Sequence, residues 1–252
     1  MKKYILKDRS LSIISNILII LVWVLLSRLV DNEVIFPSIR STITSLVEII
    51  KDPKFFDMIR YSILRSLVGY LFSLFLAILM GILSSISKFL LNLMAPIINF
   101  LRSVPTMAII ILALIWLNNE YAPIFIGFIM VFPILYETVL ESIINVDKNI
   151  IDMANLYRVD KIYIIKDIYI PNILINLSLV STSTLGINLK MVIAGEALSQ
   201  PKYGIGSHLQ LQKIYLNTPG VFAWIIIILS ISKIFEHILK GVECMLDIDK
   251  WK

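Results

Sequence analysis

Residues 145–172 read NVDKNIIDMANLYRVDKIYIIKDIYIPN and separate two long apolar stretches, Tyr121–Ile144 and Ile173–Gly195. A helix that spans a bilayer needs about 20 mostly apolar residues, and both stretches are long enough. The segment between them is polar, yet its apolar residues recur with helical spacing. We therefore expect a folded connection between two spanning helices rather than a flexible linker.

This connection is predicted to contain two short helices. Asp147 can cap the first helix, and Asp160 can cap the second, which Pro171 is expected to end. The apolar residues of the first helix have the i, i+3, i+4, i+7 spacing of one face: Ile150, Met153, Ala154 and Tyr157. An exposed apolar face usually contacts something. Spacing alone does not decide between the protein's own bundle and a partner.

Four further stretches are apolar enough to cross a membrane: Leu11–Val30, Ile63–Leu83, Phe89–Leu117 and Val221–Leu239. The whole chain is 58% hydrophobic and only 16% charged, with a mean hydropathy of +0.86, which is too apolar for one soluble core. Pro96 and Pro105 are expected to kink or break the third of the six stretches. The sequence predicts an all-α, polytopic membrane protein with six transmembrane helices.

Six spans place both termini on one side of the membrane. Of the 23 Lys and Arg residues, we assign twelve to the terminal side and only six to the other: Arg40, Lys51, Lys54, Arg60, Lys202 and Lys213. The positive-inside rule then predicts cytoplasmic termini in the cell membrane, and it explains the net charge of +5 without nucleic acid. Residues 1–35 are interpreted as a cytoplasmic tail and an uncleaved first span, because Leu11–Val30 exceeds a signal-peptide core. Residues 36–252 form the predicted core, in contact with membrane lipid.

Motifs for covalent chemistry are missing from the sequence. It has no G-x-x-x-x-G-K-[ST], G-x-S-x-G or H-E-x-x-H pattern, and His208 and His237 stand apart from any cluster with metal-ligand spacing. We expect no enzyme activity, no cofactor and no metal. Two functions open to a polytopic membrane protein are a secondary transporter driven by an ion gradient and an intramembrane enzyme. The first would need midplane charges and repeated broken helices, and the second a cluster of reactive side chains.

The connection at 145–172 resembles the "EAA" loop of ABC importer permeases, whose pattern is E-A-A, three residues, G, nine residues and I-x-L-P. Asp152-Met153-Ala154 falls on E-A-A, and Ile168-Tyr169-Ile170-Pro171 falls on I-x-L-P with the spacing intact. Arg158 takes the place of the glycine. If that turn needs a left-handed residue, a non-glycine costs roughly 1–2 kcal/mol. The turn then differs from the family's, or Arg158 makes a compensating contact.

The resemblance runs from about Phe36 to Trp251 and is closest to a subgroup that transports nitrate, sulfonates, taurine, bicarbonate and thiamine precursors. Further segments fit that subgroup in the right order: Phe100–Pro105, Phe132–Leu135, Glu196 with Gly204-Ile205-Gly206, and the terminal Trp251. This resemblance implies the type I ABC importer permease (MetI-like) fold. It implies a permease subunit that moves a small solute by alternating access, either a sulfonate-, nitrate- or taurine-like anion or a compound like a thiamine precursor.

The resemblance also implies partners and roles. A cytoplasmic ATPase subunit would bind the loop, an external solute-binding protein would deliver the solute, and a second copy would complete a homodimer. The loop residues concerned are Asp152, Met153, Ala154, Tyr157, Arg158, Ile168 and Pro171. Arg102 and Lys190 are candidates for the translocation path, although long cations also reach an interface or pair with carbonyls. Glu196 is a candidate contact for the binding protein, or a solvated charge at a helix end.

Overall fold

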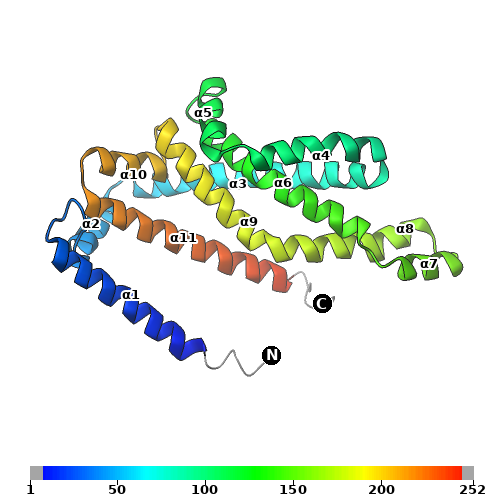
Figure 1. Cartoon of the computed structure of the whole chain (residues 1–252), viewed down its shortest axis with the longest axis horizontal. Helices are drawn as coiled ribbons and strands as arrows, with labels where there is room; N and C mark the ends of the chain where they lie inside the picture. The colour runs from blue at the N-terminus through cyan, green and yellow to red at the C-terminus, as the bar shows by residue number, and fades with distance from the viewer. Residues whose placement is uncertain (1–7, 246–252) are drawn as a thin grey trace. The chain divides into compact units, whose positions relative to one another are not determined.

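The computed structural model of the chain describes residues 8–245, which form helices joined by turns, with no strand among them (Figure 1). The helices in chain order are α1 (Asp8–Val30), α2 (Ile39–Lys51), α3 (Phe55–Ile86), α4 (Lys88–Ser103), α5 (Thr106–Trp116), α6 (Ala122–Ile144), α7 (Lys148–Leu156), α8 (Lys161–Ile164), the π-helical turn η1 (Ile165–Tyr169), α9 (Ile170–Ser199), α10 (Ile205–Ile214) and α11 (Thr218–Met245). The all-α prediction is confirmed. Trp251 and the first seven residues of the predicted tail lie outside the described residues.

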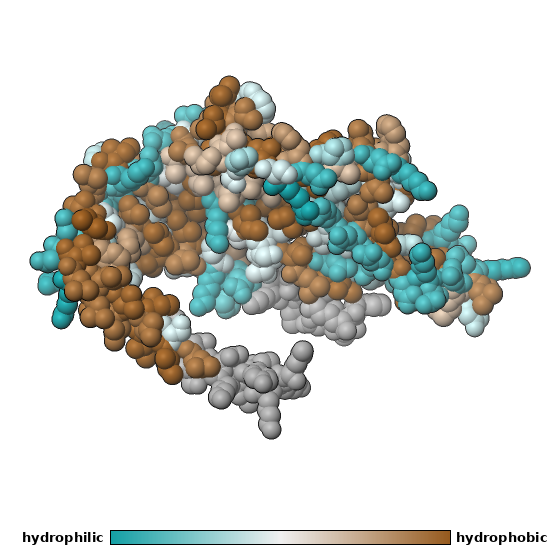
Figure 2. Space-filling view, viewed as in Figure 1, coloured by the Kyte–Doolittle hydropathy of each residue, from teal (hydrophilic) through white to brown (hydrophobic). Residues whose placement is uncertain are grey.

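Four helical stretches of the described residues are long and apolar enough to cross a membrane: Phe55–Ile86, Ala122–Ile144, Lys161–Ser199 and Thr218–Ile238. The pair α4 and α5 passes the same test jointly, which makes up to five spans if the pair counts as one. Within α1, Ile17–Val30 is a shorter apolar helix whose side chains are mostly exposed, and Figure 2 shows the hydrophobic surface along it. The chain therefore has several candidate spans, and the number six remains a prediction.

The expected break in the third apolar stretch occurs at Pro105 and not at Pro96. The axes of α4 and α5 differ by 102° across Val104 and Pro105, whereas Pro96 lies inside α4 without ending it. The backbone N–H of Val104 still bonds to the Phe100 carbonyl at 3.0 Å, so α4 closes its last turn before the chain bends. Proline removes a backbone donor, and here the break coincides with the second proline only.

The described residues form two compact units. The first comprises 8–56 and 208–229, and its interior is aromatic. Phe222 packs on Trp23 and Phe36 with ring centroids 5.4 and 5.7 Å apart, and Trp23 donates to the Pro37 carbonyl at 3.0 Å. Burial lowers the pKa of His208 below its usual value, which favours a neutral ring at physiological pH. The aromatic contacts join α1 and the turn before α2 to the start of α11.

The second unit comprises 57–207 and 230–245, and its core lies between α6 and α9 with α3 and α4 packed on it. Two glycines allow the close approach of α6 and α9. A Cβ on Gly127 would lie 2.8 Å from the Val192 side chain, and one on Gly195 would lie 2.9 Å from that of Ile126. Small residues are common where helices pack in a membrane, since dispersion contacts replace the hydrophobic effect there.

Pro171 does not end the second short helix, so that prediction is wrong. The helical path is continuous from Lys161 to Ser199, through α8, η1 and α9 (Figure 1). In the π-helical turn the N–H of Ile170 bonds to the Ile165 carbonyl, five residues back, and Pro171 follows in the first turn of α9. Proline is tolerated there because the wider turn already replaces the regular hydrogen-bond ladder.

Candidate functional site

The α7–α8 segment (Lys148–Ile164) presents large apolar side chains to its surroundings. Leu156 and Tyr157 are 80% and 76% exposed, and Met153 is 54% exposed. Ile150 is exposed as well, whereas Ala154 is buried, so Ala154 faces the segment's own interior. Asp147 caps α7 as predicted, since its carboxylate accepts from the N–H of Asn149 at 2.9 Å. In Figure 1 the segment lies beyond the ends of α4 and α6.

Arg158 adopts the left-handed conformation that the motif glycine would supply. Its φ is +52°, its N–H bonds to the Asn155 carbonyl at 3.0 Å, and the N–H of Val159 bonds to the Ala154 carbonyl at 2.9 Å. These two bonds are those of a Schellman motif that ends α7. Arg158 therefore occupies a backbone position that favours glycine, and the left-handed residue carries a strain of roughly 1–2 kcal/mol.

The remaining motif positions lie on both sides of this turn. Asp152 is exposed on α7, while Ile168 and Pro171 line a cavity of about 350 Å³ between the start of α7 and the start of α9. Asp160 stands at the N-cap position of α8, but its side chain makes no capping bond there. Ile168 and Pro171 thus join the α7–α8 segment to the long helix and do not belong to its exposed face.

At the other end of α9, Glu196 is the centre of a buried polar network, and its side chain is fully buried. The Ser62 hydroxyl lies 2.8 and 2.7 Å from its two carboxylate oxygens, and Arg65 Nη1 donates to Oε1 at 2.8 Å. The same Nη1 donates to the Tyr203 carbonyl at 2.7 Å, and Nη2 pairs with Glu120. Two helices and two loops are joined through one arginine.

The two glycines after α9 fit closely around Glu196. The N–H of Gly206 donates to Glu196 Oε2 at 3.0 Å, and the N–H of Ile205 donates to Ser62 Oγ at 2.9 Å. A Cβ on Gly204 would lie 2.8 Å from the carboxylate, and one on Gly206 would lie 2.1 Å from the Ile193 carbonyl oxygen. Side chains at both positions are excluded by contact with α9, which explains the Gly-Ile-Gly spacing after Glu196.

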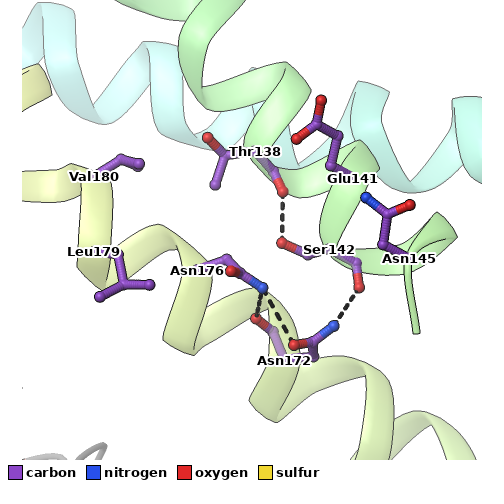
Figure 3. Close-up of a pocket in the computed structure, with 8 residues that line it drawn as sticks. All are labelled: Thr138, Glu141, Ser142, Asn145, Asn172, Asn176, Leu179 and Val180. Atoms are coloured by element: carbon purple, nitrogen blue, oxygen red, sulfur yellow. Dashed lines mark hydrogen bonds between the residues drawn. The ribbon is translucent and has the colours of Figure 1, made fainter. Parts of the chain in front are cut away.

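A polar cavity of about 400 Å³ lies between α6 and α9, near the end that leads to α7 (Figure 3). The α6 side contributes Thr138, Glu141, Ser142 and Asn145. The α9 side contributes Asn172, Asn176, Leu179 and Val180. Six of these eight residues are polar, and they lie in the last turns of α6 and the first turns of α9, two helices that are otherwise strongly apolar. Its volume falls within the range of small-molecule sites, about 300–1,000 Å³.

Comparison with known proteins bears on all three regions. The family model of the "binding-protein-dependent transport system inner membrane component" matches residues 73–243, which is more than half of the chain and includes the α7–α8 segment, α9 and the cavity. The chain belongs to this family. The resemblance inferred from the sequence is therefore confirmed for the family, and the permease is a membrane protein with several apolar helices. Permeases of this family work with ATPase and binding-protein partners in general.

Individual relatives of low sequence identity are also named as transport permeases. A Bacillus subtilis (strain 168) protein named "putative aliphatic sulfonates transport permease protein" is 25% identical over 227 residues, which are 89% of this permease and 82% of the relative. A Methanocaldococcus jannaschii "putative ABC transporter permease protein" is 28% identical over 247 residues, 94% and 91% of the two chains. A Brucella melitensis "probable ABC transporter permease protein" is 23% identical, covering 88% and 89%.

Arg102 and Lys190, the two residues of the permease predicted to line the translocation path, do not line this cavity. Arg102 ends α4 and forms an ion pair with Glu137 of α6, with both side chains partly exposed. Lys190 is exposed on α9 and forms no ion pair with a described residue. Neither is among the described residues that line the cavity. Their role in translocation stays a prediction.

The sequence reading of the permease did not find Ser62, Arg65 or Glu120. A signal for Arg65 was available, because a charge inside an apolar stretch needs a partner. Ser62 stands three residues earlier on the same face of α3 and could have been added by helical spacing. The distances along the chain to Glu120 and Glu196 are 55 and 131 residues, so pairing with them could not be read from spacing.

Proposed function

We propose that this protein is the permease subunit of an ATP-driven importer, with six spans, cytoplasmic termini and a second copy as its homodimeric partner. It moves a small solute across the cytoplasmic membrane by alternating access and performs no covalent chemistry itself. The two solute classes of its subgroup are a sulfonate-, nitrate- or taurine-like anion and a compound like a thiamine precursor. The Bacillus subtilis relative named for aliphatic sulfonates supports the first class at 25% identity.

The observation that carries the proposal is the exposed apolar surface of the α7–α8 segment. Met153, Leu156 and Tyr157 have no covering element of their own unit, and exposing large apolar side chains to water is unfavourable. A cleft on a cytoplasmic ATPase would remove this surface from water. The motif spacing around Arg158 and Pro171 supports an ATPase contact at this face.

A movement of the α7–α8 segment can reach the solute path through one helix. The path from Lys161 to Ser199 has no turn or loop in it, so a displacement at α8 is passed along α9. A ligand-driven movement needs different affinity for the two states, which nucleotide-dependent closure of the ATPase would supply. The wider hydrogen-bond ladder of η1 is the point where the helix bends most easily.

The far end of α9 suits contact with a solute-binding protein, with the contact made by the loop and not by Glu196. The carboxylate is buried and cannot touch a partner in this state. It fixes the loop that presents Lys202 and Tyr203, and the Tyr203 ring stacks on that of Tyr61 with centroids 5.5 Å apart. Lys202 also lies 5.2 Å from the Tyr203 ring centroid.

The test is co-purification of the ATPase subunit encoded with the permease. Met153→Glu places a charge on the exposed apolar face of α7, and we expect it to abolish co-purification and solute-stimulated ATPase activity. Asn155→Glu is the matched control, because Asn155 is exposed on the opposite face of the same helix and takes the same new charge. Both variants should insert into the membrane in normal amounts.

Two results would overturn the proposal. One is normal ATPase binding and transport by the Met153→Glu variant. The other is labelling of a cysteine placed at Tyr157 by an impermeant reagent applied outside intact cells, since that would put the segment on the wrong side of the membrane.

A further inference from the structure

We propose that the α6–α9 cavity is a binding site for a solute that carries a positive charge or several N–H donors. The inference rests on the proposed transport function and chooses between its two solute classes. It comes from the hydrogen-bonding groups that the cavity leaves free (Figure 3).

The donors that line the cavity are largely used by the protein. The hydroxyl of Thr138 donates to the Ile134 carbonyl at 2.8 Å, and the hydroxyl of Ser142 donates to the Thr138 carbonyl. The amide of Asn172 donates across the cavity to the Ser142 carbonyl. The amide of Asn176 donates to the carbonyl and the side-chain oxygen of Asn172 at 2.9 and 3.2 Å. Figure 3 shows the bonds made by Ser142, Asn172 and Asn176 as a chain from α6 to α9.

The acceptors that remain are oxygens. A hydroxyl that donates one bond keeps lone pairs, so Thr138 and Ser142 can accept from a ligand. The side-chain oxygen of Asn176 accepts no bond from a described residue, and the carboxylate of Glu141 has no ion-pair partner among them. The side-chain amide of Asn145 and the second N–H of Asn172 make no bond to a described residue, so a few donors remain as well. The cavity therefore offers mainly oxygen acceptors, one negative charge and few donors.

Charge in the cavity favours the same class of solute. Glu141 is the one charged residue among the described residues that line it, and no Lys or Arg is among them. The nearest cation named for the path, Arg102, is already paired with Glu137, one turn before Glu141 on α6. A sulfonate or nitrate would meet a carboxylate and few free donors, whereas an ammonium or amidinium group would form charge-assisted hydrogen bonds.

The cavity also lies next to the α7–α8 segment, so a bound solute could affect that segment. Asn145 and Asn172 line both this cavity and the smaller one beneath α7. Asn172, which donates to the Ser142 carbonyl, therefore belongs to the walls of both cavities. A bound donor that competes for Asn172 would alter the wall that the two cavities share, which links this site to the proposed coupling segment.

The experiment uses two probes of similar size and opposite charge, benzamidine and benzenesulfonate, added to the full-length permease in lipid nanodiscs and followed by isothermal titration calorimetry. We expect benzamidine to bind about tenfold more tightly than benzenesulfonate. Glu141→Gln keeps the side-chain shape, removes the charge and should weaken benzamidine binding about tenfold. Glu48→Gln, on the exposed surface of α2, is the matched control and should leave it unchanged.

Equal or tighter binding of benzenesulfonate would overturn the inference. So would binding of neither probe, or equal weakening by Glu141→Gln and Glu48→Gln. Co-purification of the ATPase with Glu141→Gln separates this failure from failure of the proposed function, because Glu141 lies outside the α7–α8 segment. A permease that keeps its ATPase and ignores benzamidine remains a permease with a different solute class.

Discussion

The two ends of α9 differ in which side chains they bury. At the Glu196 end, a carboxylate, a guanidinium and a hydroxyl are enclosed by α3, by the loop before α6 and by Gly204 and Gly206. At the α7 end, Leu156 and Tyr157 are more than three-quarters exposed, and the turn at Arg158 is strained. The polar groups are inside at one end, and the apolar groups are outside at the other.

This difference indicates which end of α9 has all its side-chain partners within the permease and which end needs a partner protein. Buried charges must be paired within the chain, so the Glu196 end is stable without a partner protein. Exposed apolar side chains are expected to be covered by a partner, so the apolar surface at the α7 end is buried only in the complex. Substitutions at the Glu196 end should therefore change stability, and those at the α7 end should change binding.

The largest effect is expected for Glu196→Ala. Removing it leaves the guanidinium of Arg65 buried with Glu120 as its one charged partner among residues 8–245, and breaking a buried ion pair costs about 3–5 kcal/mol. Thermal unfolding of the purified chain in detergent measures the loss. Asp152→Ala, at the exposed α7 end, is the control and should stay within about 0.5 kcal/mol. Equal effects at the two ends would remove the contrast between them.

A smaller effect is expected for Gly206→Ala. The new methyl group would lie 2.1 Å from the Ile193 carbonyl oxygen, so the loop must move away from α9, at a cost of about 1–3 kcal/mol. Gly186→Ala is the matched control, because a Cβ there meets no atom within 4 Å. It should be neutral or stabilise α9 by up to about 1 kcal/mol. The same unfolding measurement applies, and a stable Gly206→Ala variant would show that the loop is not tightly held.

The smallest effect is expected for Arg158→Gly, which should raise the stability of the α7 turn by about 0.5–1 kcal/mol. Glycine adopts the +52° φ without the Cβ contact, and this gain exceeds its entropic cost. Hydrogen exchange of the Val159 amide measures the local change. Arg158→Ala keeps the strain and should not slow exchange. If Arg158→Gly speeds exchange instead, the guanidinium makes a stabilising contact that outweighs the strain.

The sequence by itself determined the helical class, most of the apolar helices, a break in the third apolar stretch and the family, whereas the choice of Pro105 over Pro96 came from the structure. These follow from local properties, since hydropathy over about 20 residues and helical spacing need no knowledge of distant contacts. The cap at Asp147 and the exposed side chains of Ile150, Met153 and Tyr157 were found in the same way, whereas Ala154, predicted on the same face, is buried. Pro171 was misread, because a rule for helix ends cannot foresee a π-helical turn that continues the path into α9.

Only the tertiary structure decided the site chemistry. Glu196 was read as a surface charge and is a buried one, because Ser62 and Arg65 reach it from more than 130 residues away in the chain. The acceptor character of the cavity follows from which donors already bond to which carbonyls, and that depends on the approach of α6 and α9. Composition fixes which groups are present, whereas three-dimensional packing fixes which of them remain free to bind.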